Sequence, residues 1–294
     1  MLYLAQDYLA LIAAHILASL FTGVAYAVIM ALLGDSLHPA RNYALVFFLQ
    51  VVLGIAAGTG LSAFAEAEQV QSVAAAGMVL LASACLLMSG KLPERGTRYG
   101  VADGSTGGSR LFPAMPLVLG LVAIVLVFTG DSGIWVFLER LGAEEHGRTF
   151  GGLLVSVNLA SGAVGSLTAA WLAERWGYLW PMVVAILLSL VSLALFLLDQ
   201  YRAALIAGSF INGWAWNFGA AYRMALVAKL DSSGRFTVLI PSMQTLGNTL
   251  GPALTGVLLL SGLAAAFSVI AALWSAALLC YFFAWRTYWS KRDD

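Results

Sequence analysis

The chain has 294 residues, of which 61% are hydrophobic and only 10% are charged. An average globular chain is roughly 45–50% apolar and about 25% charged, so this composition excludes a soluble globular protein, a disordered chain and a secreted disulfide scaffold. Fifteen Lys and Arg residues balance fifteen Asp and Glu residues, and a chain without net charge has no overall field to attract nucleic acid. Cys85 and Cys280 lie inside apolar stretches, where Cys behaves as a small buried hydrophobic residue.

Apolar stretches long enough to cross a bilayer recur along the whole chain. A transmembrane α-helix needs about 20 mostly apolar residues. Nine stretches meet this requirement: 9–33, 43–65, 72–90, 113–138, 149–173, 179–198, 204–229, 236–260 and 264–285. The first is too long for a cleavable signal peptide, and none shows the alternation of an outer-membrane barrel. The sequence therefore predicts an all-α integral membrane protein with about nine transmembrane helices.

The basic residues between these stretches predict how the chain is oriented in the membrane. With nine spans, twelve of the fifteen Lys and Arg residues fall on one side, and only Arg140, Arg148 and Arg202 fall on the other. Cytoplasmic loops carry an excess of Lys and Arg, whereas Asp and Glu contribute little to orientation. We therefore expect a plasma (inner) membrane protein with its N-terminus outside and its C-terminus in the cytoplasm.

Strongly polar side chains occur in six of the nine spans. They are His15, Gln50, Asp131, Asn158, Asn212, Asn217, Arg223, Gln244 and Asn248. The spans 72–90, 179–198 and 264–285, which are every third span, contain none. Because such side chains are costly in hydrocarbon, they usually face a bundle interior or a water-filled cavity. We predict that these three spans face lipid and that the other six line a polar cavity.

Two parts of the chain, six spans apart, share a pattern. In each, a Gln follows an Arg by nine residues and precedes a Gly-x-x-x-Gly pair: Arg41, Gln50 and Gly54/Gly58, then Arg235, Gln244 and Gly247/Gly251. This indicates a duplicated architecture, which is common among secondary transporters. The Gly pairs predict close helix packing. The longest hydrophilic stretch, 91–112, contains Gly-Ser-Thr-Gly-Gly-Ser and predicts a flexible cytoplasmic linker.

The segment Gly165–Pro181 reads GSLTAAWLAERWGYLWP. It resembles the short cytoplasmic signature of the major facilitator superfamily of secondary transporters. The positions that match are Gly165, Ala169, Glu174, Arg175 and Gly177. In that family this tight loop is a conformational motif, in which the acid and the Arg can pair with each other and with helix ends.

Other segments extend this resemblance over the whole chain. Gly130–Gly142 is similar to the family's seventh helix, and Arg235–Gly256 is similar to its tenth-to-eleventh junction and eleventh helix. The first span is similar to the fourth helix, with His15 where many members carry Arg. The family has twelve helices in two six-helix halves, so the resemblance implies a six-helix C-terminal bundle, 113–294, behind the linker. The residues before the linker, 1–90, then correspond to three helices of the N-terminal bundle. This indicates a truncated product rather than a natural nine-helix derivative.

We predict that ten residues contact the substrate or a coupled ion. They are Asp131, Trp135, Asn158, Asn212, Trp216, Asn217, Gln244, Asn248, His15 and Gln50. Asp131 is the one acid deep in a span, so it is a candidate for proton exchange; the alternative is an acid hydrogen-bonded to a neighbouring helix. Trp supplies a flat apolar surface, and Asn and Gln orient a ligand by hydrogen bonds. We expect Arg223 to extend its guanidinium to the cytoplasmic interface.

The sequence therefore favours alternating-access transport of a small organic solute, coupled to an ion, with the proton as the expected ion. It contains no G-x-S-x-G, no H-E-x-x-H and no phosphate-binding G-x-x-x-x-G-K-[ST], so we expect no enzyme, no cofactor and no metal. The alternative is a transport-inactive membrane protein or assembly partner. An amphipathic cation, a sugar and an organic acid all stay open as substrates, as do import, export and the oligomeric state.

Overall fold

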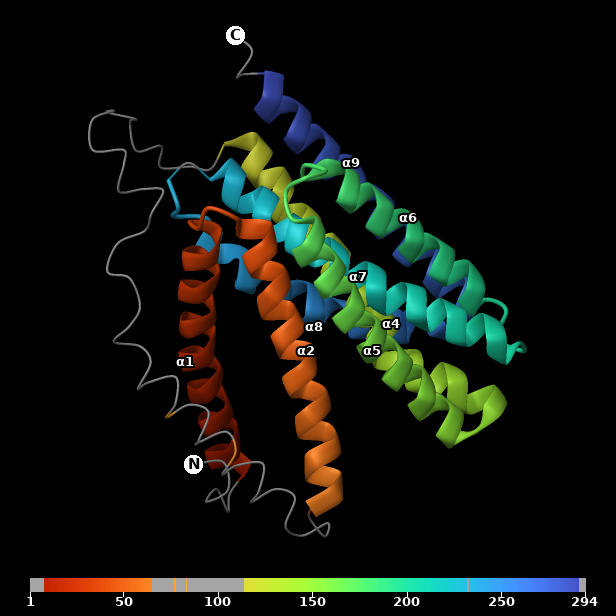
Figure 1. Ribbon diagram of the computed structural model, residues 1–294. Helices are drawn as coiled ribbons and strands as arrows, with labels where there is room; N and C mark the ends of the chain where they lie inside the picture. Colours follow the sequence, from red (N-terminus) through yellow and green to blue (C-terminus); the bar gives the residue numbers. More distant parts are fainter. Residues whose placement is uncertain (1–7, 65–76, 78–82, 84–113, 232, 291–294) are drawn as a thin grey trace, which may run out of the picture.

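The computed structural model describes residues 8–64, 77, 83, 114–231 and 233–290, and every regular element within them is a helix (Figure 1). The elements are α1 (Tyr8–Gly34), α2 (Pro39–Phe64), α4 (Met115–His146), α5 (Arg148–Leu172), α6 (Leu179–Phe196), α7 (Arg202–Leu230), the short 3-10 helix η2 (Thr237–Leu239), α8 (Ile240–Leu259) and α9 (Leu263–Ser290). The predicted span 72–90 and the predicted linker 91–112 lie outside the described residues apart from the isolated positions 77 and 83.

The helices follow the predicted spans closely, with α4 and α9 longer than expected. Helix α4 continues to His146 because its last turns are amphipathic, with Arg140 and Glu144 paired at 2.6 Å one turn apart. Within the described residues, five helices are long and apolar enough to cross a membrane: α2, α4, α5, α6 and α9. Polar side chains interrupt the apolar stretches of α7 and α8. The count of nine spans therefore stays a prediction.

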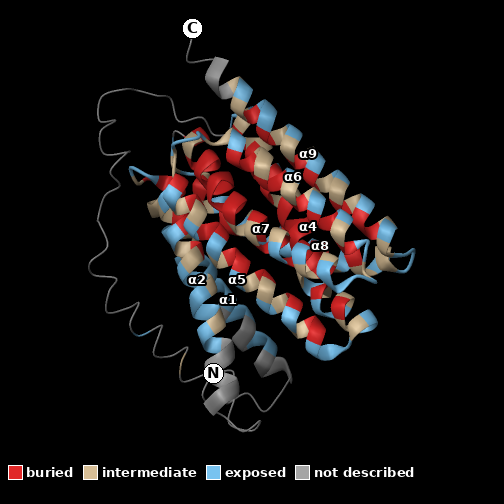
Figure 2. Cartoon of the chain, turned by 45° about the vertical axis from the view of Figure 1, so that its right-hand side comes forward, coloured by how far each residue is buried: buried red, intermediate tan, exposed pale blue. Residues whose placement is uncertain are grey.

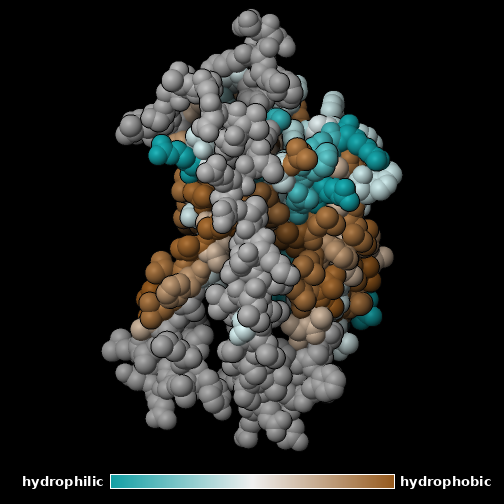
Figure 3. Space-filling view, turned by 60° about the vertical axis from the view of Figure 1, so that its left-hand side comes forward, coloured by the Kyte–Doolittle hydropathy of each residue, from teal (hydrophilic) through white to brown (hydrophobic). Residues whose placement is uncertain are grey.

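The helices α4 to α9 pack into one bundle around α7, whose C-terminal half is almost completely buried (Figure 2). Helices α5 and α6 contact α7, while α8 and α9 contact α4. Large apolar side chains are nevertheless exposed along the outer faces of the helices, including Trp180, Leu187 and Phe283. Figure 3 shows a hydrophobic band around the middle of the described surface, with hydrophilic residues gathered near one end. This surface suits a lipid bilayer.

Helices α1 and α2 lie beside this bundle and contact it mainly at one end of the molecule (Figure 1). That end carries the segments 34–41 and 173–178, residue 231 and the segment 233–239, and we call it the closed end. There α1 approaches α7 and η2 so tightly that a Cβ atom at Gly34 would lie 2.8 Å from Ala228 Cβ and 3.2 Å from Thr237 Cγ2. Away from the closed end, α1 and α2 diverge from the bundle, and most of their described side chains are exposed.

The two predicted Gly-x-x-x-Gly pairs have different surroundings. Gly247 and Gly251 confirm the expected close packing, since a Cβ atom at Gly247 would lie 2.6 Å from Phe128 Cβ of α4. A Cβ atom at Gly251 would collide with Ser132 Oγ and the Thr129 carbonyl. At Gly54 the prediction is wrong: nothing lies within 4 Å of a Cβ there, because α2 faces a cavity at this position. The side chain of residue 58 lies outside the description.

Replacing Gly251 with Ala should lower the free energy of unfolding by roughly 1–3 kcal/mol, because the added methyl forces α8 away from α4. Gly152→Ala is the matched control. It also lies within a helix, but its Cβ would meet nothing within 4 Å, so the change should be neutral or stabilise the helix by up to about 1 kcal/mol. Thermal and denaturant unfolding of both variants in micelles checks this, and equal stabilities would contradict the α4–α8 packing.

Candidate functional site

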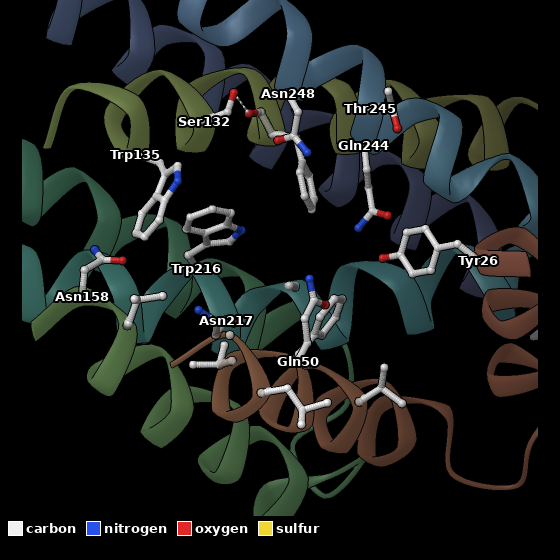
Figure 4. Close-up of a pocket in the computed structure, with 18 of the residues that line it drawn as sticks. Tyr26, Gln50, Ser132, Trp135, Asn158, Trp216, Asn217, Gln244, Thr245 and Asn248 are labelled. Carbon is white, nitrogen blue, oxygen red and sulfur yellow. Dashed lines mark hydrogen bonds between the residues drawn. The ribbon is translucent and has the colours of Figure 1, made fainter. Parts of the chain in front are cut away.

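A cavity of about 900 Å³ lies between α1 and α2 on one side and α4, α5, α7 and α8 on the other (Figure 4). Its polar and aromatic lining includes Tyr26, Gln50, Ser132, Trp135, Asn158, Trp216, Asn217, Gln244, Thr245 and Asn248. The described parts of α6 and α9 contribute no lining residue. This confirms that the spans 179–198 and 264–285 stay out of the polar cavity, whereas the span 72–90 lies outside the described residues.

The structure brings together seven of the ten predicted site residues. Gln50, Trp135, Asn158, Trp216, Asn217, Gln244 and Asn248 all line the cavity. Asp131 and Asn212 lie behind its wall, and the side chain of His15 lies outside the description. The prediction omits Tyr26, whose hydroxyl points into the cavity (Figure 4). The sequence indicates this role, because Tyr26 is a polar aromatic residue well inside the first span rather than at a membrane interface.

One end of the cavity is aromatic. The rings of Trp135 and Trp216 meet edge to face, with centroids 6.1 Å apart and planes at 67° (Figure 4). Asn158 lies beside them, and its amide nitrogen donates to the Ser209 carbonyl and to Asn212 Oδ1, each at 3.1 Å. Because Asn158 is held from behind in this way, its position in the wall is set by α7.

Asn212 has an interhelical role rather than a place in the wall. Its oxygen accepts from Asn158 of α5 and its nitrogen donates to Ser192 Oγ of α6 at 3.4 Å. The neighbouring Gly213 permits this, because a Cβ atom there would collide with the Asn158 carbonyl. Asn212 therefore links α5, α6 and α7 at a point where α5 and α7 pack closely.

The other end of the cavity is built around Gln244 of α8, which is only 5% exposed. Its amide nitrogen lies 3.8 Å from Met224 Sδ, and its Oε1 has no hydrogen-bond partner among the described residues. The Tyr26 hydroxyl points toward this amide from α1 (Figure 4). The side chains of Gln50 and Asn248 are exposed to the cavity. This end therefore presents several amides and one buried acceptor that lacks a donor.

Asp131 and Arg223 form a buried ion pair behind the cavity. They are 3% and 2% exposed, and Arg223 Nη2 lies 3.8 Å from Asp131 Oδ2. The same Nη2 donates to the Trp216 carbonyl at 3.0 Å. The expectation that Arg223 extends to the interface is thus wrong. Gly219 leaves the space for it to turn inward, since a Cβ there would lie 2.7 Å from Arg223 Nη1.

Asp131 faces away from the cavity although Trp135, one turn later on α4, lines it. Residues four apart on a helix differ in direction by about 40°. That difference is enough for Trp135 to face the cavity while Asp131 faces the bundle interior. The buried side chains of Trp274 and Tyr281 on α9 lie near Asp131. The carboxylate therefore lies in the bundle interior, where a charge needs a partner.

Glu174 connects the two groups of helices at the closed end. Its Oε1 accepts the backbone N–H of Ala40 at 3.1 Å, and its Oε2 lies 3.4 Å from His38 Nδ1. Ala40 is in the first turn of α2, where free N–H groups and the helix dipole favour a negative charge. Glu174 thus contacts a helix end, which is one of the two pairings that the resemblance implies for this acid.

The other residues of the conformational motif shape the α5–α6 connection. Gly165 packs against the backbone of α7, where a Cβ would collide with the Trp214 carbonyl. Gly177 has a φ of +67°, which favours glycine. Arg175 lies over the Trp171 ring, 5.7 Å from its centroid, and no ion pair between Arg175 and Glu174 occurs in the described part of the chain.

Comparison with known proteins agrees with this architecture. None of the curated proteins matches the sequence. Among solved structures, the crystal structure of a Major Facilitator Superfamily transporter, FucP, in the outward conformation is similar with a TM-score of 0.62 and 17% identity, over 84% of this chain and 68% of that chain. At this identity the likeness shows the fold alone. The sequence model of the Major Facilitator Superfamily matches residues 119–292. Because this match covers more than half of the chain, the protein belongs to the major facilitator superfamily.

Proposed function

We propose that the protein is a secondary transporter that moves a small organic solute across the plasma (inner) membrane by alternating access. The observation that carries this proposal is a cavity between two groups of helices that touch at the closed end and diverge away from it. Rocking of one group against the other around a central site would expose the cavity to each side in turn. Transporters of this type are not enzymes and need no cofactor.

The proposed domains are a partial N-terminal bundle, 1–90, a cytoplasmic linker, 91–112, and a C-terminal six-helix bundle, 113–294. The closed end carries Arg41, Arg175, Arg235 and, in the last turn of α7, Lys229, and these belong to the side that holds twelve of the fifteen Lys and Arg residues. An excess of basic residues marks the cytoplasmic side, so we place the closed end and the C-terminus in the cytoplasm and the N-terminus outside. In this orientation the cavity of the described conformation faces outward.

Asp131 is the proposed site of proton coupling. It is buried, and its partner Arg223 also holds the Trp216 carbonyl at the cavity wall. A proton on Asp131 would remove the charge that faces Arg223, and the guanidinium would then seek another acceptor. The hydrogen bond to Trp216 links such a change to the cavity, because Trp216 is one of its lining residues.

A transport-inactive membrane protein or assembly partner is the second candidate. The membrane fold and the family match are compatible with it as well as with transport. Both candidates share the membrane location and the fold. They differ in whether the cavity can be reached from both sides of the membrane.

Replacing Glu174 with Ala should open the closed end more often, because the N-terminus of α2 loses its anionic partner. A thiol reporter at Thr245→Cys, in a chain whose Cys85 and Cys280 are replaced by Ala, measures access to the cavity wall. In inverted vesicles, a membrane-impermeant maleimide should label this reporter roughly tenfold faster in the Glu174→Ala variant, the factor expected from the loss of one charge-assisted hydrogen bond.

Glu145→Ala, at an exposed position in the last turn of α4 at the opposite end, is the matched control and should leave the labelling rate unchanged. In right-side-out vesicles the reporter should react readily without any further change. Alternating access is refuted if the reporter never reacts from the cytoplasmic side in any variant, or if it reacts equally fast from both sides in all of them.

A further inference from the structure

The described wall of the cavity is uncharged. None of its described lining residues is Asp, Glu, Lys or Arg, and the one buried acid of the spans is paired with Arg223 outside the wall. An ion entering the cavity would lose hydration without gaining a partner of opposite charge there, which is costly. Of the three substrate classes that the sequence leaves open, the wall therefore disfavours the amphipathic cation and the organic acid.

The side-chain oxygen of Gln244 has no donor in hydrogen-bonding geometry among the described residues, although the Tyr26 hydroxyl lies beside the same amide. Gln244 is 5% exposed, and it lies in the cavity wall. Buried acceptors in folded proteins are normally satisfied, so this oxygen is suited to a donor that a ligand brings. The amides of Gln50 and Asn248 and the hydroxyl of Tyr26 face the same space (Figure 4).

A hydroxyl group fits this set of partners better than an amine or a carboxylate does. It donates to Gln244 Oε1 and accepts from an amide N–H or the Tyr26 hydroxyl at the same time, whereas an ammonium only donates and a carboxylate only accepts. Several hydroxyls on one solute would use several of these amides. The opposite end of the cavity offers the Trp135 and Trp216 rings, whose faces accommodate an apolar ring surface.

We propose that the cavity binds an uncharged polyhydroxylated ring of monosaccharide size, with one hydroxyl donating to Gln244 Oε1 and the C–H face of the ring against Trp216. The proposal rests on the proposed function only in taking this cavity as the solute site. The cavity volume of about 900 Å³ is ample for such a ring.

The test measures binding by the full chain in lipid nanodiscs, which avoids sugar-based detergents, as a ligand-induced rise in melting temperature. The probes are three pyranoses that share one ring: D-glucose, its cationic analogue D-glucosamine and its anionic analogue D-glucuronate, at a pH at which both analogues are ionised. D-xylose and myo-inositol extend the neutral set. We expect at least one neutral probe to bind, and the charged analogues to bind at least about tenfold more weakly than the neutral ring.

Gln244→Leu should weaken binding of the neutral probe by about tenfold, because the ligand hydroxyl loses its acceptor. Thr249→Val is the matched control. Thr249 lies one turn further along α8, is not among the described lining residues of the cavity, and its hydroxyl donates to the Thr245 carbonyl at 2.9 Å, so binding should change less than about twofold. If Gln244→Leu does not fold, Gln244→Met removes the same acceptor from an unbranched side chain.

Three results would overturn the assignment: no binding of any neutral probe, equal or tighter binding of a charged analogue, or unchanged affinity in the Gln244 variants. Failure of this assignment is separable from failure of the transport proposal. Two-sided labelling of the Thr245→Cys reporter without polyol binding would leave a transporter of another substrate class. Polyol binding with one-sided labelling would leave a binding site that does not transport.

Discussion

Replacing Asp131 with Asn should lower the free energy of unfolding by about 3–5 kcal/mol. The change leaves Arg223, which is 2% exposed, as a buried charge without a counter-charge, and breaking a buried pair from one side is strongly destabilising. Thermal and denaturant unfolding of the purified variant measures the effect. Glu144→Gln is the matched control, because it breaks the Arg140–Glu144 pair on the surface, whose side chains are 67% and 58% exposed. An exposed pair contributes less than about 1 kcal/mol.

The double variant Asp131→Asn/Arg223→Gln should recover most of this loss, since it removes both charges and leaves no buried charged group without a counter-charge. Such recovery identifies the uncompensated guanidinium as the cause. If the double variant is as unstable as the single one, the two losses are independent and Asp131 and Arg223 do not act as a pair.

The same double variant should retain solute exchange but lose uphill transport. With both charges absent, the proposed proton site behind the wall is removed, together with the guanidinium that links it to Trp216. In proteoliposomes, counterflow of the best-binding neutral solute should continue at a rate comparable with that of the wild type. Accumulation driven by a pH gradient should fall at least about tenfold, the factor that follows from losing roughly 1.4 kcal/mol of coupling free energy.

Stability does not confound this comparison, because counterflow reports folded, functional protein in the same vesicles. The Glu174→Ala variant serves as a further control, since it changes the closed end without touching Asp131 and should reduce rates while preserving the dependence on the gradient. A double variant that still concentrates the solute as the wild type does would remove Asp131 from the coupling mechanism.

The sequence alone determines where the helices lie and which of them avoid the cavity. Both follow from the free-energy cost of placing polar groups in hydrocarbon. An apolar run of sufficient length forms a helix in lipid because the helix satisfies its own backbone groups, and an Asn or Gln within such a run needs a polar environment. The spans without such residues, 179–198 and 264–285, accordingly contribute nothing to the described cavity wall. The α5–α6 connection can also be predicted from the sequence, because Glu174 contacts a backbone N–H group and Gly177 has a positive φ within a short segment.

The tertiary structure decides which polar residues face the cavity and which face each other. Asp131 and Trp135 are one turn apart on α4, whereas Arg223 lies 92 positions after Asp131 in the sequence. Helical spacing therefore cannot show that Asp131 pairs with Arg223 while Trp135 lines the cavity. That outcome depends on how far α4 and α7 rotate about their axes when they pack. Gly219 supplies the space for the Arg223 side chain. Packing likewise leaves Gln244 Oε1 without a partner within the described part of the chain. The composition of a span supplies the amide, and only the neighbouring helices determine whether a donor reaches it.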